Sequence, residues 1–221
     1  MTSTSATSGT LSTRQQAIIP IAADAAAGDM AKLDDALNQG LDAGLSVSDV
    51  REVLVQVYAY AGFPRSLNAL GALTNVLEAR KRRGIQDAPG HAPSRPIPTG
   101  EALLAAGTAN QTKLAGAPVK GPLLEFAPAI DEYLKTHLFG DIFERDNLDW
   151  QSRELATVGM LAAMPGVESQ LQAHMRISMN VGLAAGQLRQ LCQVLADHVD
   201  ADAARRAREA LEQQLVAASA R

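Results

Sequence analysis

The sequence is poor in cysteine and in aromatic residues. Cys192 is the only cysteine among 221 residues, so neither an intrachain disulfide nor a two-thiol redox centre can form within one chain. Phenylalanine, tryptophan and tyrosine together make up 4% of the chain, whereas hydrophobic residues make up 47% and alanine is abundant. A composition of this kind favours closely packed helices. We therefore expect an all-α protein with a substantial core.

Signals for nucleic acid, membrane and export are also missing. The net charge is −4 with acids and bases mixed throughout, and the one compact basic cluster, residues 80–83, ends a predicted helix, where cations interact favourably with the helix dipole. No apolar run approaches membrane-spanning length, and residues 1–10 lack the basic and apolar regions of a signal peptide. We expect a cytoplasmic protein that binds neither nucleic acid nor membrane.

Motifs for metals and organic cofactors are absent as well. No pair of histidines or thiols has the spacing of metal ligands, and no group of acidic residues clusters near a histidine. Glycine-rich phosphate loops, nucleophile elbows and dinucleotide fingerprints are not found either. The sequence therefore predicts neither a metal nor a cofactor.

What the sequence does contain is helical periodicity, divided by capping residues, glycines and prolines. Six of the ten prolines fall between residues 84 and 122, which predicts a connector with one short helix near residues 100–106. We expect the other helices at residues 12–26, 30–43, 50–61, 65–83, 123–137, 140–145, 184–198 and 201–218, with two more inside residues 150–183 on either side of a break at Pro165-Gly166.

The two halves of the chain resemble each other. Residues 37–45 (LNQGLDAGL) are similar to residues 175–183 (MRISMNVGL), and in both places a short cap and a periodic helix follow. This similarity predicts a tandem repeat of one helical unit. We place the first repeat at residues 12–83, the proline-rich connector at 84–122, and the second repeat with a C-terminal helix at 123–221.

The second repeat carries an acid and an imidazole where a core is expected. Glu154 precedes Val158 by four residues and so projects onto the apolar stripe of its helix, while His174 lies in the middle of the apolar face of the next helix. A buried carboxylate requires a partner, because an unpaired buried charge is very unfavourable. The pair indicates acid–base chemistry. The plainer interpretation is that His174 is a core histidine bonded to a backbone carbonyl or to the neighbouring acid.

Several stretches together resemble the carboxymuconolactone decarboxylase family. LDWQSRELATVGMLAA and QLQAHMRISMNVGL are similar to the core of that family, EVLVQVYAYAGFPRSLNAL to the helix and turn after the core, and YLKTHLFGDIFERDNLDWQSRELAT to the lead-in of its single-repeat members. The resemblance implies an all-α fold whose repeats interlock in an oligomeric ring. For a chain with two repeats it implies a homotrimer.

The chain departs from the peroxidase branch of that fold. Alkylhydroperoxidase-like members carry a glutamate, a CxxC and a histidine four residues after the second cysteine. Glu154 and His174 match the outer positions, but Val167 and Gln170 stand where the cysteines would be. Without a thiol nucleophile and its resolving partner, disulfide-type peroxide reduction is disfavoured.

The first repeat differs from the second in the residues that it keeps. Ala36 occupies the place of His174, and either Gln15 or Gln16 occupies that of Glu154. The first repeat instead keeps Glu52, Tyr58, Tyr60 and a Gly-Phe-Pro turn at residues 62–64, which the second repeat lacks. We therefore expect one site per chain, with acid and base from one repeat and a pocket wall from the other.

The resemblance implies cofactor-independent decarboxylation of a small lactone or carboxylated ring compound, with His174 as general acid/base and Glu154 as its partner. Tyr60, Arg65, Glu52 and Lys120 are the candidates for substrate binding. Each also has a plainer interpretation: packing for Tyr60, an exposed surface position for Arg65 and Lys120, and a solvent-facing or interface position for Glu52. The alternative function is a non-catalytic oligomeric module of the same fold that binds a small molecule or a protein.

Overall fold

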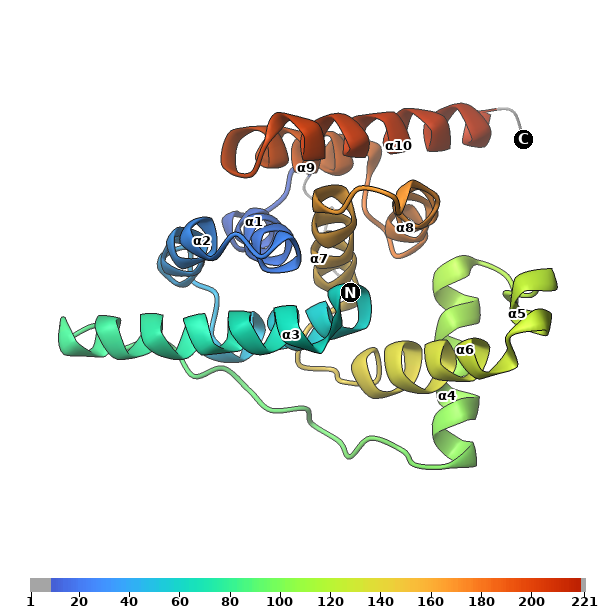
Figure 1. Cartoon of the computed structure of the whole chain (residues 1–221), viewed down its shortest axis with the longest axis horizontal. Helices are drawn as coiled ribbons and strands as arrows, with labels where there is room; N and C mark the ends of the chain where they lie inside the picture. Colours follow the sequence, from blue (N-terminus) through green and yellow to red (C-terminus); the bar gives the residue numbers. More distant parts are fainter. Residues whose placement is uncertain (1–8, 220–221) are drawn as a thin grey trace, which may run out of the picture.

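The computed structural model describes residues 9–219, and in this part of the chain all the regular structure is helical, as predicted. Figure 1 shows the helices stacked around a centre where α1 (Thr13–Ala27) and α7 (Trp150–Ala163) lie side by side. None of the described helices is long and apolar enough to cross a membrane.

The first repeat consists of α1, α2 (Met30–Asp42) and a long element, α3 (Val47–Arg82), which folds back on itself. Gly62 has φ 83° and ψ 162°, outside the helical region, and it divides α3 into arms at residues 47–61 and 63–82. The Ser66 hydroxyl on the second arm donates to the Leu54 carbonyl on the first, at 2.8 Å. The predicted break at the Gly-Phe-Pro turn is therefore a reversal of direction, which glycine permits because it has no Cβ.

The second repeat has the same order of helices: α7, α8 (Glu168–Asn180), α9 (Ala185–His198) and α10 (Ala201–Ser219). The turns after α2 and α8 also have the same geometry. Gly44 and Gly182 have φ of 91° and 98°, and the next residue of each turn donates its N–H to a carbonyl five residues earlier, Leu45 to Gly40 and Leu183 to Ser178, both at 3.0 Å. The short similarity seen in the sequence thus corresponds to one turn that occurs twice.

One core serves both repeats. It includes Ile18, Ile19 and Ile21 from α1 together with Leu155, Val158 and Met160 from α7, and all six are buried. At the crossing, a Cβ added to Gly159 would lie 2.8 Å from the Ile19 carbonyl oxygen. The two central helices are this close because Gly159 has no side chain. The two repeats therefore do not have separate cores.

The segment between the repeats is more helical than predicted. The short helix expected near residues 100–106 is α4 (Glu101–Ala115), 15 residues long. It packs closely on a π-helix, η1 (Leu134–Ile142), where a Cβ on Gly107 would lie 1.7 Å from the Lys135 carbonyl oxygen. Packing against η1 stabilises a helix that the proline-flanked, weakly amphipathic sequence does not indicate.

The single helix predicted at residues 123–137 is also different. Pro128 begins a new helix, so the segment divides into α5 (Pro122–Phe126) and α6 (Pro128–Tyr133), and α6 leads into η1. Proline is favoured in the first turn of a helix and disfavoured in its interior, which explains the division. A second, smaller apolar cluster lies under this region and includes Leu114, Leu138, Phe139, Ile142, Phe143 and Ile177.

Candidate functional site

Glu154 on α7 and His174 on α8 are in direct contact. His174 Nδ1 lies 2.8 Å from Glu154 Oε2, and the Glu154 side chain is fully buried. The Asp149 carboxylate fixes the start of α7 by accepting the Ser152 N–H at 2.8 Å. Residues 152–162 of α7 are all buried, so a carboxylate on any face of this stretch needs an internal partner. The imidazole of His174 is the partner that the structure provides.

The contact between Glu154 and His174 uses one oxygen of the carboxylate and one nitrogen of the ring. An ionised carboxylate only accepts hydrogen bonds, so the His174 ring donates from Nδ1, and its Nε2 makes no hydrogen bond among the described residues. The His174 side chain is 10% exposed, so the ring is not completely enclosed. Glu154 Oε1 is buried and has no hydrogen-bond partner within residues 9–219. The pair thus presents a free imidazole nitrogen beside an unsatisfied carboxylate oxygen.

Tyr60, at the end of the first arm of α3, brings the other repeat to this site. Its ring meets that of His174 edge to face, with 5.7 Å between centroids and an interplanar angle of 78°. The Thr157 Oγ1 and Tyr60 Oη atoms are 3.3 Å apart. Burial raises the pKa of Tyr60, and the nearby charge of Glu154 raises it further. The hydroxyl therefore stays protonated at physiological pH and can donate a hydrogen bond.

Glu52 is buried, not solvent-facing as its plainer interpretation suggested. The Arg145 guanidinium binds both of its oxygens, Nη2 to Oε1 at 2.6 Å and Nε to Oε2 at 2.8 Å, and Arg153 Nη2 adds a contact to Oε2 at 3.2 Å. Burial alone would raise the pKa of Glu52, but hydrogen bonds from Arg145 and Asn147 and the charge of Arg153 outweigh it and lower the pKa to about 2. Glu52 is thus an ionised carboxylate between two arginines.

A chain of polar contacts links this ion-pair group to Tyr60. Arg153 Nη1 donates to Gln56 Oε1 at 3.3 Å, which fixes the orientation of the Gln56 amide. Gln56 Nε2 then donates to Thr157 Oγ1 at 2.8 Å, and Thr157 in turn contacts Tyr60. Sequence reasoning missed Arg153, Gln56 and Thr157. The only available signal was the position of Arg153 next to Glu154, just before the nearly all-apolar stretch of residues 155–163 in the same helix.

The two cations predicted to bind substrate lie elsewhere in the chain. The Arg65 guanidinium lies over Gly28 at the end of α1, so close that a Cβ on Gly28 would overlap it. Lys120 lines a cavity between α4 and α5. Of the candidate site residues, the structure therefore brings together Glu154, His174 and Tyr60, and connects Glu52 to them indirectly.

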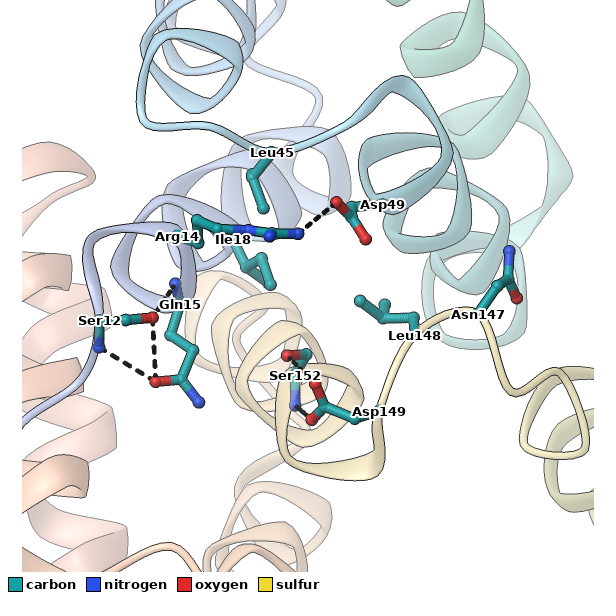
Figure 2. A pocket seen from close by; sticks show the side chains of 10 residues that line it. All are labelled: Ser12, Arg14, Gln15, Ile18, Leu45, Asp49, Asn147, Leu148, Asp149 and Ser152. Atoms are coloured by element: carbon teal, nitrogen blue, oxygen red, sulfur yellow. Dashed lines mark hydrogen bonds and ion pairs between the residues drawn. The ribbon is translucent and has the colours of Figure 1, made fainter. Parts of the chain in front are cut away.

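A cavity of about 380 Å³ lies where α1, α3 and α7 begin (Figure 2). Several of its polar groups fix these helix starts. Asp49 Oδ2 accepts from Arg14 at 2.7 Å, Ser12 and Gln15 cap α1, and Asp149 caps α7, as the dashed lines show. This cavity is lined by other residues than the acid–base pair, and we assign it a structural role.

The sequence profile of the carboxymuconolactone decarboxylase family matches residues 2–75 and 128–213, well over half of the chain. The chain belongs to the carboxymuconolactone decarboxylase family. The two matched segments correspond to the two helical repeats, which agrees with the predicted duplication. A search of the curated proteins found no match.

The turn that occurs at both Gly44 and Gly182 allows the two repeats of this chain to be aligned residue by residue. The spacing from Gly44 to Gly182 relates four residues of the site to four counterparts: Glu154 to Gln16, His174 to Ala36, Gln56 to Val194 and Tyr60 to His198. All four counterparts line one cavity of about 210 Å³ between α1, α2 and α9.

The cavity lined by these four counterparts, which we call the pseudo-equivalent cavity, explains why one site per chain is expected. It repeats the arrangement of the first site with the repeats exchanged, but it contains neither the acid nor the adjacent imidazole. Its position also decides between the two glutamines: Gln16 lines the cavity, whereas Gln15 forms the capping box of α1 with Ser12. Within residues 9–219, only the second repeat supplies an acid–base pair to a site between the repeats.

We expect the substitution Glu52→Gln to destabilise the protein by about 3 kcal/mol at neutral pH, because Arg153 would remain buried without a counter-charge. A carboxyl whose pKa is lowered on folding stabilises the protein above its unfolded pKa, and this stabilisation is lost as the pH falls toward the folded pKa. The deficit of the variant should therefore shrink between about pH 5 and pH 2.

Urea unfolding of the wild type and of Glu52→Gln across this pH range measures the effect. The same substitution at the exposed Glu212 controls for the loss of one carboxylate. A deficit that stays constant down to the lowest pH would contradict an ionised, ion-paired Glu52.

Proposed function

We propose that this protein is a cofactor-independent decarboxylase that acts on a small lactone or related carboxylated ring compound. The observation that carries the proposal is the bond between His174 Nδ1 and Glu154 Oε2, which leaves the imidazole Nε2 free in a mostly apolar environment. Membership of the carboxymuconolactone decarboxylase family supports the class of reaction. The proposal includes the cytoplasmic location and the homotrimeric assembly expected from the sequence.

The reaction requires an electron sink, a proton donor and stabilisation of negative charge. When the bond to the carboxylate breaks, carbon dioxide leaves and the electron pair moves into the conjugated lactone carbonyl, giving a dienolate. His174, protonated at Nε2, then transfers a proton to the dienolate carbon, and Glu154 stabilises the imidazolium form before transfer. A proton from solvent restores the imidazolium, so that the substrate exchanges carbon dioxide for a proton.

Tyr60 has the properties of a hydrogen-bond donor to the dienolate oxygen. Its raised pKa keeps the hydroxyl protonated, and Thr157, positioned by Gln56, holds the hydroxyl in place. A preorganised donor of this kind stabilises charge that develops in the transition state. Glu52 acts at a distance, because it orients Arg153 and through it Gln56. Glu52 is thus a positioning residue in this proposal.

The homotrimer is supported by apolar side chains exposed beside the site. Phe63 is 64% and Leu67 63% exposed; Phe63 lies in the turn at residues 62–64, just after Tyr60, and Leu67 lies one helical turn further on. Exposed apolar residues grouped in this way are typical of interaction surfaces. Light scattering should give a mass of about 70 kDa, three times the chain mass of 23.3 kDa. A mass of one chain at micromolar concentration would contradict the trimer.

The alternative, a binding module without catalysis, has one observation in its favour. His174 is only 8% exposed in the single chain, and the cavities described above are lined by other residues. Arg65 and Lys120, the two cations predicted to bind the substrate, also lie away from the pair. The decarboxylase proposal therefore assigns the cation to a neighbouring subunit.

Carbon dioxide release from a panel of lactone acids tests the proposal. We expect His174→Ala to lower kcat at least about a hundredfold, since it removes the proton donor, and Tyr60→Phe to lower it roughly tenfold. His137 offers a matched control, because it forms a similar contact with a carboxylate, Asp141, at 3.0 Å on the surface. His137→Ala should have the wild-type rate.

Equal rates for the wild type and His174→Ala would remove His174 from the mechanism. No turnover by the wild type on any lactone acid of the panel would contradict the decarboxylase and favour the binding module.

A further inference from the structure

Asp24 is a buried acid near the end of α1. The residue is 1% exposed, and residues 18–26 of the helix around it are all buried. Its Oδ2 atom has no hydrogen-bond partner, and the carboxyl group forms no ion pair within residues 9–219. An unpaired ionised carboxylate is very unfavourable in such a place. The arrangement around Asp24 is therefore that of a protonated, neutral carboxyl group.

The ammonium group of Lys32, in the first turn of α2, is bonded to another partner. Lys32 Nζ donates to the Val199 carbonyl oxygen at 2.8 Å, and Asp29 Oδ2 lies 3.8 Å from it. Val199 ends α9 and begins the turn to α10, which comes close to α2 at the upper left of Figure 1. Lys32 thus attaches the α9–α10 turn to the first repeat and leaves Asp24 without a counter-charge.

The charges that act on Asp24 come from α2 and from the α9–α10 turn. Burial raises the pKa of Asp24 to about 7, the charge of Lys32 lowers it, and the charges of Asp29 and Asp200 raise it. Asp29 and Asp200 are held in place because they cap α2 and α10. Arg65 of α3 lies over the end of α1. Lys32 is therefore the cation that stabilises an ionised Asp24.

The other charged groups of the helices near α1 are engaged elsewhere. On α7 they are Arg153 and Glu154, which belong to the ion-pair group and to the acid–base pair. At the end of α9, Asp197 accepts from a glutamine of the same helix, and His198 lines the pseudo-equivalent cavity. Arg206 of α10 donates to a carbonyl oxygen at the end of α7. The state of Asp24 thus depends on α2 and the α9–α10 turn.

We propose that Asp24 is a proton switch that controls the attachment of the α9–α10 turn to α2. While Asp24 is protonated, Lys32 binds the Val199 carbonyl oxygen, as in the structure. When Asp24 loses its proton to solvent, the Lys32 ammonium leaves the carbonyl oxygen and pairs with the carboxylate, because an unpaired buried charge is more unfavourable than a carbonyl group that turns to water.

Release of the turn has a consequence for the first repeat. His198, next to Val199, lines the pseudo-equivalent cavity, so movement of the turn changes one wall of that cavity. The switch involves neither Glu154 nor His174 and does not depend on the decarboxylase proposal.

Hydrogen exchange of the backbone amides of residues 199–206 tests the proposal at about pH 5.5 and about pH 8.5, with rates corrected for the intrinsic effect of pH. We expect the wild type to be at least roughly tenfold less protected at the higher pH. Asp24→Asn cannot ionise and should be equally protected at both values. Lys32→Met lacks the ammonium group and should be poorly protected at both.

Thermal unfolding gives a second measurement that does not depend on the turn alone. A carboxyl group whose pKa is raised on folding stabilises the protein below its unfolded pKa, and this stabilisation is lost as the pH rises through the folded pKa. Between the same two pH values, the melting temperature of the wild type should therefore fall by at least about 4 °C relative to that of Asp24→Asn.

Asp35→Asn, at an exposed position on α2, is the matched control and should behave as the wild type does in both measurements. A wild-type turn that is equally protected at both pH values would overturn the proposal. So would an Asp24→Asn variant that keeps the full pH response of the wild type in exchange or in melting temperature.

Discussion

The carboxylate of Glu52, held between Arg145 and Arg153, is the interaction on which the site depends. It joins the first repeat to the lead-in and the central helix of the second, and it compensates a guanidinium that is fully buried. Without this carboxylate, Arg153 would be an unpaired charge in the core, which is very unfavourable. The same arginine orients Gln56, and through Thr157 the orientation reaches Tyr60 beside His174. The acid–base pair is thus completed by a network that crosses between the repeats.

Duplication followed by divergence explains the asymmetry of the molecule. Each repeat contributes helices to two pseudo-equivalent positions, yet only one position has an acid and an imidazole in contact. At the other position, Ala36 replaces the imidazole and leaves a small cavity. The insertion between the repeats then adds α4, which packs on the π-helix, and α5, which packs beside α6, and a cavity lies between α4 and α5.

Local signals predicted much of this structure. The turn glycines Gly44 and Gly182, the reversal at Gly62 and the apolar periodicity gave the helices and the repeat, and helical spacing directed Glu154 and His174 toward the core. The burial of Glu52 was not predicted, because its ion pairs come from residues more than ninety positions away and leave no local pattern. The length of α4 was missed for a similar reason, since the contact of Gly107 with η1 is a tertiary one.

The protonation of the His174 ring gives the most direct test of the pairing with Glu154. Nitrogen NMR of the histidine-labelled protein distinguishes a protonated Nδ1 from a protonated Nε2. We expect the neutral ring in the wild type to carry its proton on Nδ1, because the carboxylate accepts it at 2.8 Å, and to lose this preference in Glu154→Leu. A neutral wild-type ring protonated on Nε2, or the same pattern in both proteins, would contradict the role assigned to the pair.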